Sequence, residues 1–99
     1  VSLNARPRIL RQLASYRLIY LYDQKQNFEG AANEARLFIR NHSYSFLLED
    51  VYISLARFYE LLGQYDMAEA TYLRILELFP DTRFAQEYLQ KLGIQEDVD

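Results

Sequence analysis

Apolar residues return at intervals of three and four along most of the chain, the spacing that places side chains on one face of an α-helix. Polar, turn-prone stretches interrupt this pattern at residues 23–27 and 41–45. Only three glycines and two prolines occur, which leaves few of the turns that an all-β fold needs. The pattern therefore predicts five helices, at about residues 7–24, 28–41, 48–62, 65–79 and 82–92.

Residues that favour helix ends stand where the apolar pattern starts and stops. Pro7 suits a first helical turn, where a missing N–H costs nothing, and Pro80 cannot continue a helix. Gly63 and Gly93 suit positions just after a helix. In the first two segments the recurring apolar residues are Leu10, Leu13, Ala14, Leu18 and Leu21, then Ala31, Ala32, Ala35, Phe38 and Ile39.

One stretch of the chain occurs twice. Residues 22–31 and 59–68 both hold an aromatic residue, a turn, a second aromatic residue and an alanine at the same spacing. The offset is 37 residues (59 minus 22), and Phe38 and Ile75 fall in the same register. Repeats of this length are typical of helical arrays, in which each unit packs on the next. We therefore expect two helix–turn–helix units.

The second unit resembles the tetratricopeptide repeat, whose pattern is W-x2-L-G-x2-Y…A-x3-F…P. It reads Tyr52-x2-Leu55-Ala56-x2-Tyr59…Ala68-x3-Tyr72…Pro80, so each position holds the expected residue type or a close substitute. Ala56 and Ala68 are small where the resemblance implies that paired helices cross closely, and the large residues fill the spaces around these crossings. We expect Ala56, Tyr59, Ala68 and Tyr72 to be interior.

The first unit follows the same pattern less closely. It reads Ser15-x2-Leu18-Ile19-x2-Tyr22…Ala31-x3-Ala35…Ser43. Ile19 stands in place of the small residue at the crossing, and Ser43 in place of the proline. The offset exceeds the usual period of 34 by three residues, which we assign to the loop at about residues 43–47.

The resemblance implies an all-α, right-handed α-solenoid of two helix–turn–helix units and a C-terminal capping helix. In this interpretation the domain covers residues 1–93, with units at about 7–43 and 48–81 and the capping helix at 82–92. Residues 94–99 form an acidic, flexible tail. Because two units and a cap are close to the smallest stable array, we expect the chain to be part of a larger array or to self-associate.

A narrower resemblance lies within the family. The run of residues 78–87, Leu-Phe-Pro-Asp-Thr-Arg-Phe-Ala-Gln-Glu, is similar to the end of one helix and the start of the next in bacterial envelope repeat proteins. These include the outer-membrane assembly lipoprotein and the periplasmic partner of the Tol–Pal system. The similarity favours a location in the bacterial periplasm or cell envelope over the cytoplasm.

Charge is divided unevenly along the 99 residues. Residues 1–17 hold four arginines and no acid, whereas the rest holds 7 basic and 14 acidic residues, so +4 and −7 give the net charge of −3. A nucleic-acid partner is not expected, because such proteins usually have a basic domain. Arg6, Arg8 and Arg11 lie near a helix N-terminus, which disfavours cations. They contact an acidic partner or phospholipid head groups, or they are merely solvated.

The residue types needed for catalysis do not gather anywhere in the sequence. His42 is the one histidine and lies in a polar loop, and there is no cysteine, so no metal-ligand spacing occurs. The three glycines are isolated, which excludes a glycine-rich phosphate loop. No run of apolar residues is long enough to span a membrane. We expect no enzymatic activity and no cofactor.

The resemblance implies a concave groove, lined by the first helix of each unit, that binds a peptide or protein. The residues that it assigns to this groove are Leu13, Tyr16, Arg17, Tyr20, Ile53, Arg57, Phe84 and Tyr88. The Lys, Asn and Arg clamp of chaperone-binding repeats is absent, since its places hold Tyr16, Tyr20, Asp50 and Ser54. Tyr and Arg are common at binding hot spots. The alternative is that this aromatic face packs against a second copy of the chain or another part of a larger repeat protein.

Overall fold

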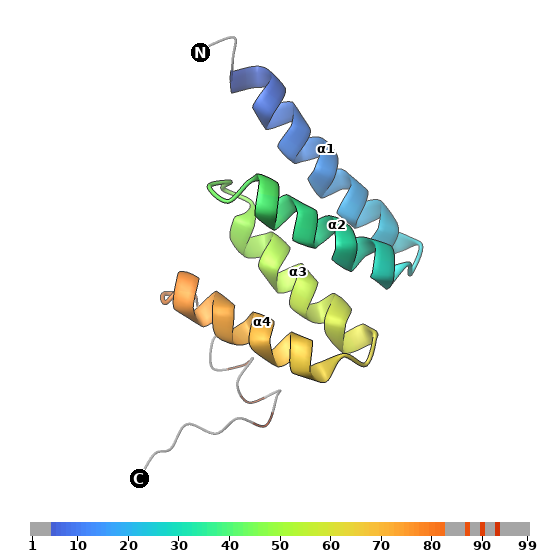
Figure 1. Cartoon of the computed structure of the whole chain (residues 1–99), viewed down its shortest axis with the longest axis vertical. Helices are drawn as coiled ribbons and strands as arrows, with labels where there is room; N and C mark the ends of the chain where they lie inside the picture. The colour runs from blue at the N-terminus through green and yellow to red at the C-terminus, as the bar shows by residue number, and fades with distance from the viewer. Residues whose placement is uncertain (1–4, 83–86, 88–89, 91–92, 94–99) are drawn as a thin grey trace.

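The computed structural model describes residues 5–82, 87, 90 and 93. Its elements are four helices, α1 (Ala5–Gln24), α2 (Phe28–Asn41), α3 (Leu48–Leu61) and α4 (Tyr65–Leu78) (Figure 1). These bounds agree with the first four predicted helices to within two residues. The predicted capping helix at 82–92 lies mostly outside the described residues. In the part that is described, no helix has the length and apolar character needed to cross a membrane.

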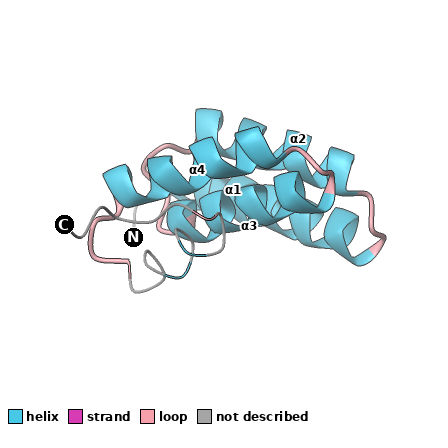
Figure 2. Ribbon diagram, turned by 90° about the horizontal axis from the view of Figure 1, so that it is seen from below, coloured by secondary structure: helices cyan, strands magenta, loops and turns pink. Residues whose placement is uncertain are grey.

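The four helices form two layers. Each packs against the next along the chain, α1 on α2, α2 on α3 and α3 on α4. Figure 2 shows α1 and α3 in one layer and α2 and α4 in the other. The chain is therefore an all-α helical repeat solenoid, as predicted, and the first helix of each unit lies on the same side.

Local sequence sets where the helices begin. The side chain of Asn27 caps α2 by accepting a hydrogen bond of 3.0 Å from the backbone N–H of Gly30. Glu49 and Asp50 occupy the first turn of α3, and Asp66 that of α4, where the helix dipole favours acidic side chains. The two helices run antiparallel, so the first turn of α3 lies beside the end of α4.

The core is built from alanines that allow close helix contact and large side chains that fill the remaining space. Ala31, Ala35, Ala56 and Ala68 are completely buried. The large buried residues beside them are Phe38, Phe58, Tyr59, Tyr72 and Ile75. The prediction that Ala56, Tyr59, Ala68 and Tyr72 are interior is confirmed. Small residues at these positions let the helix backbones approach each other. The larger side chains can pack closely only when the backbones are this near.

The recurring leucines of α1 lie outside the core. The recurring residues Leu10, Leu13, Leu18 and Leu21 are all exposed, and Ile19 is the buried aliphatic residue of this helix. The inward face is held by polar contacts as well, including the hydrogen bond of 2.9 Å that Ser15 donates to Glu34 of α2. The recurring leucines therefore do not mark the buried side of α1, where Ile19, Tyr16 and Tyr22 pack against the core.

The turns within the two units have a positive φ at equivalent positions, on different residues. Gly63 follows α3 with φ of 76°, and Gln26, 37 residues earlier, follows α1 with φ of 60°. A positive φ is natural for glycine and strained for glutamine, whose Cβ crowds the neighbouring carbonyl oxygen. The repeat geometry is thus kept in the first unit at a local conformational cost.

Enlarging Ala68 tests the predicted core. We expect Ala68→Leu to lower the free energy of unfolding by about 1–3 kcal/mol, because the added atoms have no space at the contact between α3 and α4. Urea unfolding followed by circular dichroism measures this loss. The matched control is Ala70→Leu, an exposed position on the same helix, which should change stability by less than about 0.5 kcal/mol. Equal midpoints for the two variants would contradict the repeat register.

Candidate functional site

The residues predicted to line a groove are divided between two helices of one layer. We call the described members the inner strip; they are Leu13, Tyr16, Arg17 and Tyr20 of α1 and Ile53 and Arg57 of α3. Residues three and four apart share one face of a helix, so each set forms a continuous row. The other two predicted residues, Phe84 and Tyr88, lie outside the described residues.

The inner strip combines exposed and half-buried side chains. Tyr20 is 57% exposed and Leu13 is 44% exposed, while Tyr16 and Ile53 are half-buried. Aromatic and aliphatic surface is therefore accessible beside partly buried residues whose positions are held by the core. A surface of this kind loses unfavourable hydration when a partner covers it.

Arg57 already has a partner within the chain. Its Nη2 atom donates to the carboxylate of Asp23, so an ion pair joins α1 to α3 across the two units. The guanidinium also lies 5.1 Å from the ring centre of Phe58. The sequence led us to expect Arg57 as a hydrogen-bond donor for a partner, and this stays a prediction. Its role in the described structure is to link the units, with a contribution of about 0–1 kcal/mol because the pair is partly exposed.

Tyr16 is the titratable residue of the inner strip whose environment is altered. Burial raises the pKa of its phenol above the ordinary value of 10.0, and the negative charge of Asp50 on α3 raises it further. Both effects disfavour the phenolate. Tyr16 therefore keeps its proton over a wider alkaline range and remains able to donate a hydrogen bond.

Other tyrosines are committed to the interior. The Tyr72 hydroxyl donates to Glu60 over 2.8 Å, and the Tyr59 hydroxyl accepts from Arg36 over 3.1 Å. Both side chains are buried, and these contacts satisfy their polar ends. Tyr16 and Tyr20 lie on the inner strip instead, where Tyr20 is largely exposed.

Two hollows lie where each second helix ends beside the first helix of its unit. The first, here called the basic pocket, measures about 640 Å³ and is lined by Arg8, Arg11 and Gln12 of α1 and residues 41–45. The second, here called the acidic pocket, measures about 570 Å³ and is lined by Glu49, Asp50 and Ile53 of α3 and residues 78–82. Residues 41–45 and 78–82 differ by the repeat offset of 37, so the pockets occupy equivalent places in the two units.

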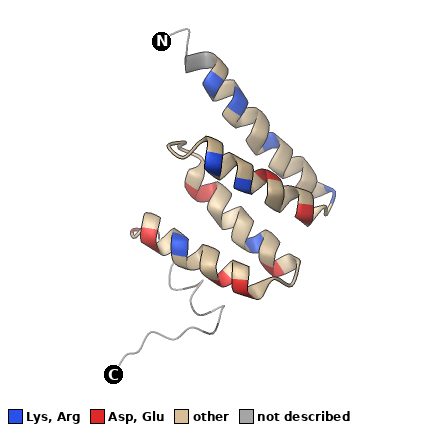
Figure 3. Cartoon of the chain, in the orientation of Figure 1, with Lys and Arg blue, Asp and Glu red and all other residues tan. Residues whose placement is uncertain are grey.

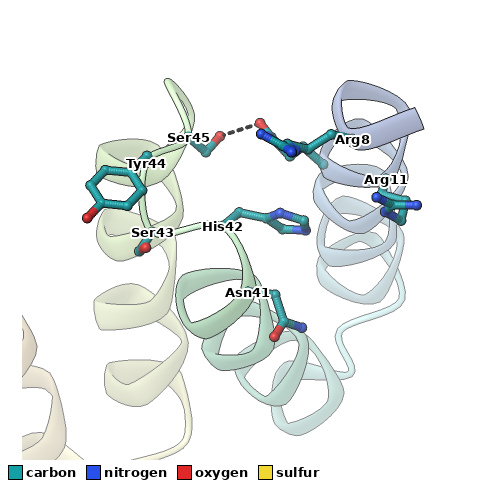
Figure 4. Close-up of a pocket in the computed structure, with 8 residues that line it drawn as sticks. Arg8, Arg11, Asn41, His42, Ser43, Tyr44 and Ser45 are labelled. Carbon is teal, nitrogen blue, oxygen red and sulfur yellow. Dashed lines mark hydrogen bonds between the residues drawn. The ribbon is translucent and has the colours of Figure 1, made fainter. Parts of the chain in front are cut away.

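Sequence reasoning missed the basic pocket. His42 was interpreted as an isolated loop residue, yet its side chain points toward α1, where Arg8 and Arg11 lie (Figure 4). The predicted hairpin could have indicated this pocket. In a helix–turn–helix unit the end of the second helix returns beside the start of the first. Among the described residues, no group of three or more His, Asp or Glu side chains could hold a metal ion.

Comparison with known proteins bears on the second unit most directly. Residues 49–92 match the family model of the tetratricopeptide repeat. This match covers α3, α4 and the segment of the predicted capping helix, and it supports the family resemblance. Tetratricopeptide repeats are non-catalytic scaffolds that generally mediate protein–protein interaction. No curated protein and no solved structure matches the chain. The narrower resemblance of residues 78–87 to envelope proteins gains no support and stays a prediction.

Removing the charge of Asp50 tests the environment of Tyr16. We expect Asp50→Asn to lower the pKa of Tyr16 while leaving it above 10.0, since burial is the larger cause. A pH titration of ring-labelled tyrosine by NMR measures this. Glu49→Gln is the matched control and should leave the Tyr16 curve unchanged. A Tyr16 pKa unaffected by Asp50→Asn would show that the two groups do not interact.

The same raised pKa has a consequence for stability. The folded chain holds the Tyr16 proton more tightly than the unfolded chain, so the folded state binds more protons above pH 10.0. The contribution of Tyr16 to stability is therefore complete below the unfolded pKa and is lost as pH rises through the folded pKa.

Proposed function

We propose that this chain is an interaction scaffold that binds a segment of another protein along the inner strip. The observation that carries the proposal is the exposed pair Tyr20 and Leu13 beside half-buried Tyr16 and Ile53, on the layer formed by the first helix of each unit. The family match at residues 49–92 supports a protein as the partner, because tetratricopeptide repeats generally act in this way.

The energetic argument rests on apolar contact. Covering apolar surface is worth about 25 cal/mol per Å², and a tyrosine side chain offers a large area with only two flexible torsion angles. Tyr16 and Ile53 pack against the core, so part of the ordering cost of binding is already met by folding. Arg17 is exposed on the same row and is the free cation of the described strip, since Arg57 pairs with Asp23.

Truncating Tyr20 tests this proposal. A peptide ligand is first selected by display on the intact chain, and its affinity is then measured by fluorescence anisotropy. We expect Tyr20→Ala to weaken binding roughly thirtyfold or more, which corresponds to ~2 kcal/mol, because a buried aromatic anchor is lost. Its unfolding midpoint should stay close to that of the parent, since Tyr20 is largely exposed.

Tyr65→Ala provides the matched control. Tyr65 is 64% exposed and lies at the start of α4, in the other layer, so its removal should leave affinity unchanged. The inner strip is the wrong surface if Tyr65→Ala loses the peptide and Tyr20→Ala keeps it.

The alternative role is self-association. It is favoured by the outward face of α1, where Leu10 is 63% exposed and Leu21 is 40% exposed, with Leu18 between them. These leucines share the side of α1 that faces away from the described solenoid. A second copy that covered them would continue the helix stacking by which the units pack.

Sedimentation velocity over a wide range of dilution tests self-association. If the outward leucines mediate it, the average sedimentation coefficient should fall to the monomer value on dilution, and Leu10→Glu together with Leu21→Glu should give a monomer throughout. Leu73→Glu on α4, which is 46% exposed, is the matched control and should behave as the parent does. A parent chain that stays monomeric at high concentration contradicts this role.

A further inference from the structure

The basic pocket brings three basic side chains to one hollow. Arg8 and Arg11 are three residues apart on α1 and both line the hollow, and His42 points toward α1 from the loop that follows α2 (Figure 4). The residues that line this hollow include no aspartate or glutamate. Figure 3 shows the same basic character along the first half of α1 and acidic residues at the start of α3. The pocket is thus a local positive region on an acidic chain.

The loop side of the pocket is held in place by short contacts. The Ser45 hydroxyl donates to Gln12 Oε1 over 2.8 Å, which ties the loop to α1. The backbone N–H of Ser45 donates to the carbonyl oxygen of His42 over 3.0 Å. The His42 ring meets Phe38 edge to face, with ring centres 5.0 Å apart. Because folding already orders this loop, a ligand has little of it left to order.

The arginines of the pocket are not neutralised by the part of the chain that the structure describes. The ion pairs there are Arg57 with Asp23 and Arg74 with Glu77. Arg8 and Arg11 are three apart on one helix, so their charges repel each other. An anion placed between them would relieve this repulsion and form charge-assisted hydrogen bonds with both guanidinium groups.

A purely structural explanation is that the arginines offset the negative end of the α2 dipole. The acidic pocket argues against this, because it lies at the equivalent end of α4 and carries Glu49, Asp50 and Asp81 instead. The positions equivalent to Arg8 and Arg11 hold Ser45 and Leu48. The same arrangement of helices therefore exists without a positive pocket, so the fold does not require one.

We propose that the basic pocket binds an oxyanion, a carboxylate or a phosphate group, carried by the protein segment that the scaffold binds. This rests on the proposed function and adds to it an acidic or phosphorylated residue in the partner. Guanidinium groups match both oxyanions in geometry. A membrane or nucleic acid fits less well, because residues 18–99 carry −7 and repel an extended polyanionic surface.

The experiment uses short peptides as probes and NMR of the intact chain as the readout. The probes are acetylated peptides with three glutamates, with one phosphoserine among glutamines, and with glutamines alone, together with inorganic phosphate. We expect the acidic or the phosphorylated peptide, or both, to shift the amide signals of residues 41–45, and the glutamine peptide to leave them unchanged. Comparing the two active probes identifies the oxyanion, and the effect should weaken as salt is added.

Variants then assign the binding to the arginines. The double variant Arg8→Gln, Arg11→Gln should weaken the binding of the acidic probes at least about tenfold. Lys25→Gln with Arg74→Gln is the control, since it changes net charge equally at exposed positions outside the pocket. Arg8→Lys with Arg11→Lys keeps the charge and should restore part of the binding. A thermal melt of each variant separates loss of binding from loss of fold.

Three outcomes would overturn the proposal. The first is no shift at residues 41–45 with any acidic probe, or equal shifts with the glutamine peptide. The second is unchanged binding in the Arg8→Gln, Arg11→Gln variant. The third is binding to phosphatidylserine vesicles without binding to the peptides. Tyr20→Ala should not affect these short probes, so failure of the pocket and failure of the inner strip give separate results.

Discussion

Close contact between helix backbones at alanine positions is the constraint on which the described structure depends. Ala31, Ala35, Ala56 and Ala68 are completely buried, and they allow neighbouring helices to approach while larger residues fill the space on either side. Each such contact fixes how one helix lies on the next. The layer of α1 and α3, the inner strip and both pockets follow from that stacking, because none of them lies within a single helix.

The repeat explains which parts of the fold could be predicted from the sequence. Four helices and the buried positions Ala56, Tyr59, Ala68 and Tyr72 follow from the offset of 37 residues and from the spacing of the apolar residues. The orientation of α1 did not follow, because its inward face relies on hydrogen bonds such as Ser15 to Glu34. A pairing of that kind depends on two particular side chains meeting, and periodicity carries no information about it.

The candidate site likewise has parts that the sequence pattern predicts and parts that it does not. The predicted strip of Tyr16 and Tyr20 is accessible, but Arg57 is occupied by Asp23, a contact between residues 34 apart that no local pattern indicates. His42 lines the basic pocket together with Arg8, which is equally distant in the chain. Repeat scaffolds keep backbone geometry constant while side chains vary, so equivalent hollows can carry opposite charge. Their ligand preference is decided by these individual residues, and sequence reasoning finds them only after the units are superimposed.

The turn at Gln26 makes the two units unequal in local stability. Gly63 adopts its positive φ freely, whereas a similar φ costs Gln26 roughly 1–2 kcal/mol in conformational free energy. A hairpin whose turn is strained opens at a lower free energy than one whose turn is relaxed, other contacts being equal. On this ground we expect the α1–α2 hairpin to separate first from the array and its amide hydrogens to exchange sooner. Covering α1 with a bound partner would raise the protection of this hairpin more than that of α3 and α4.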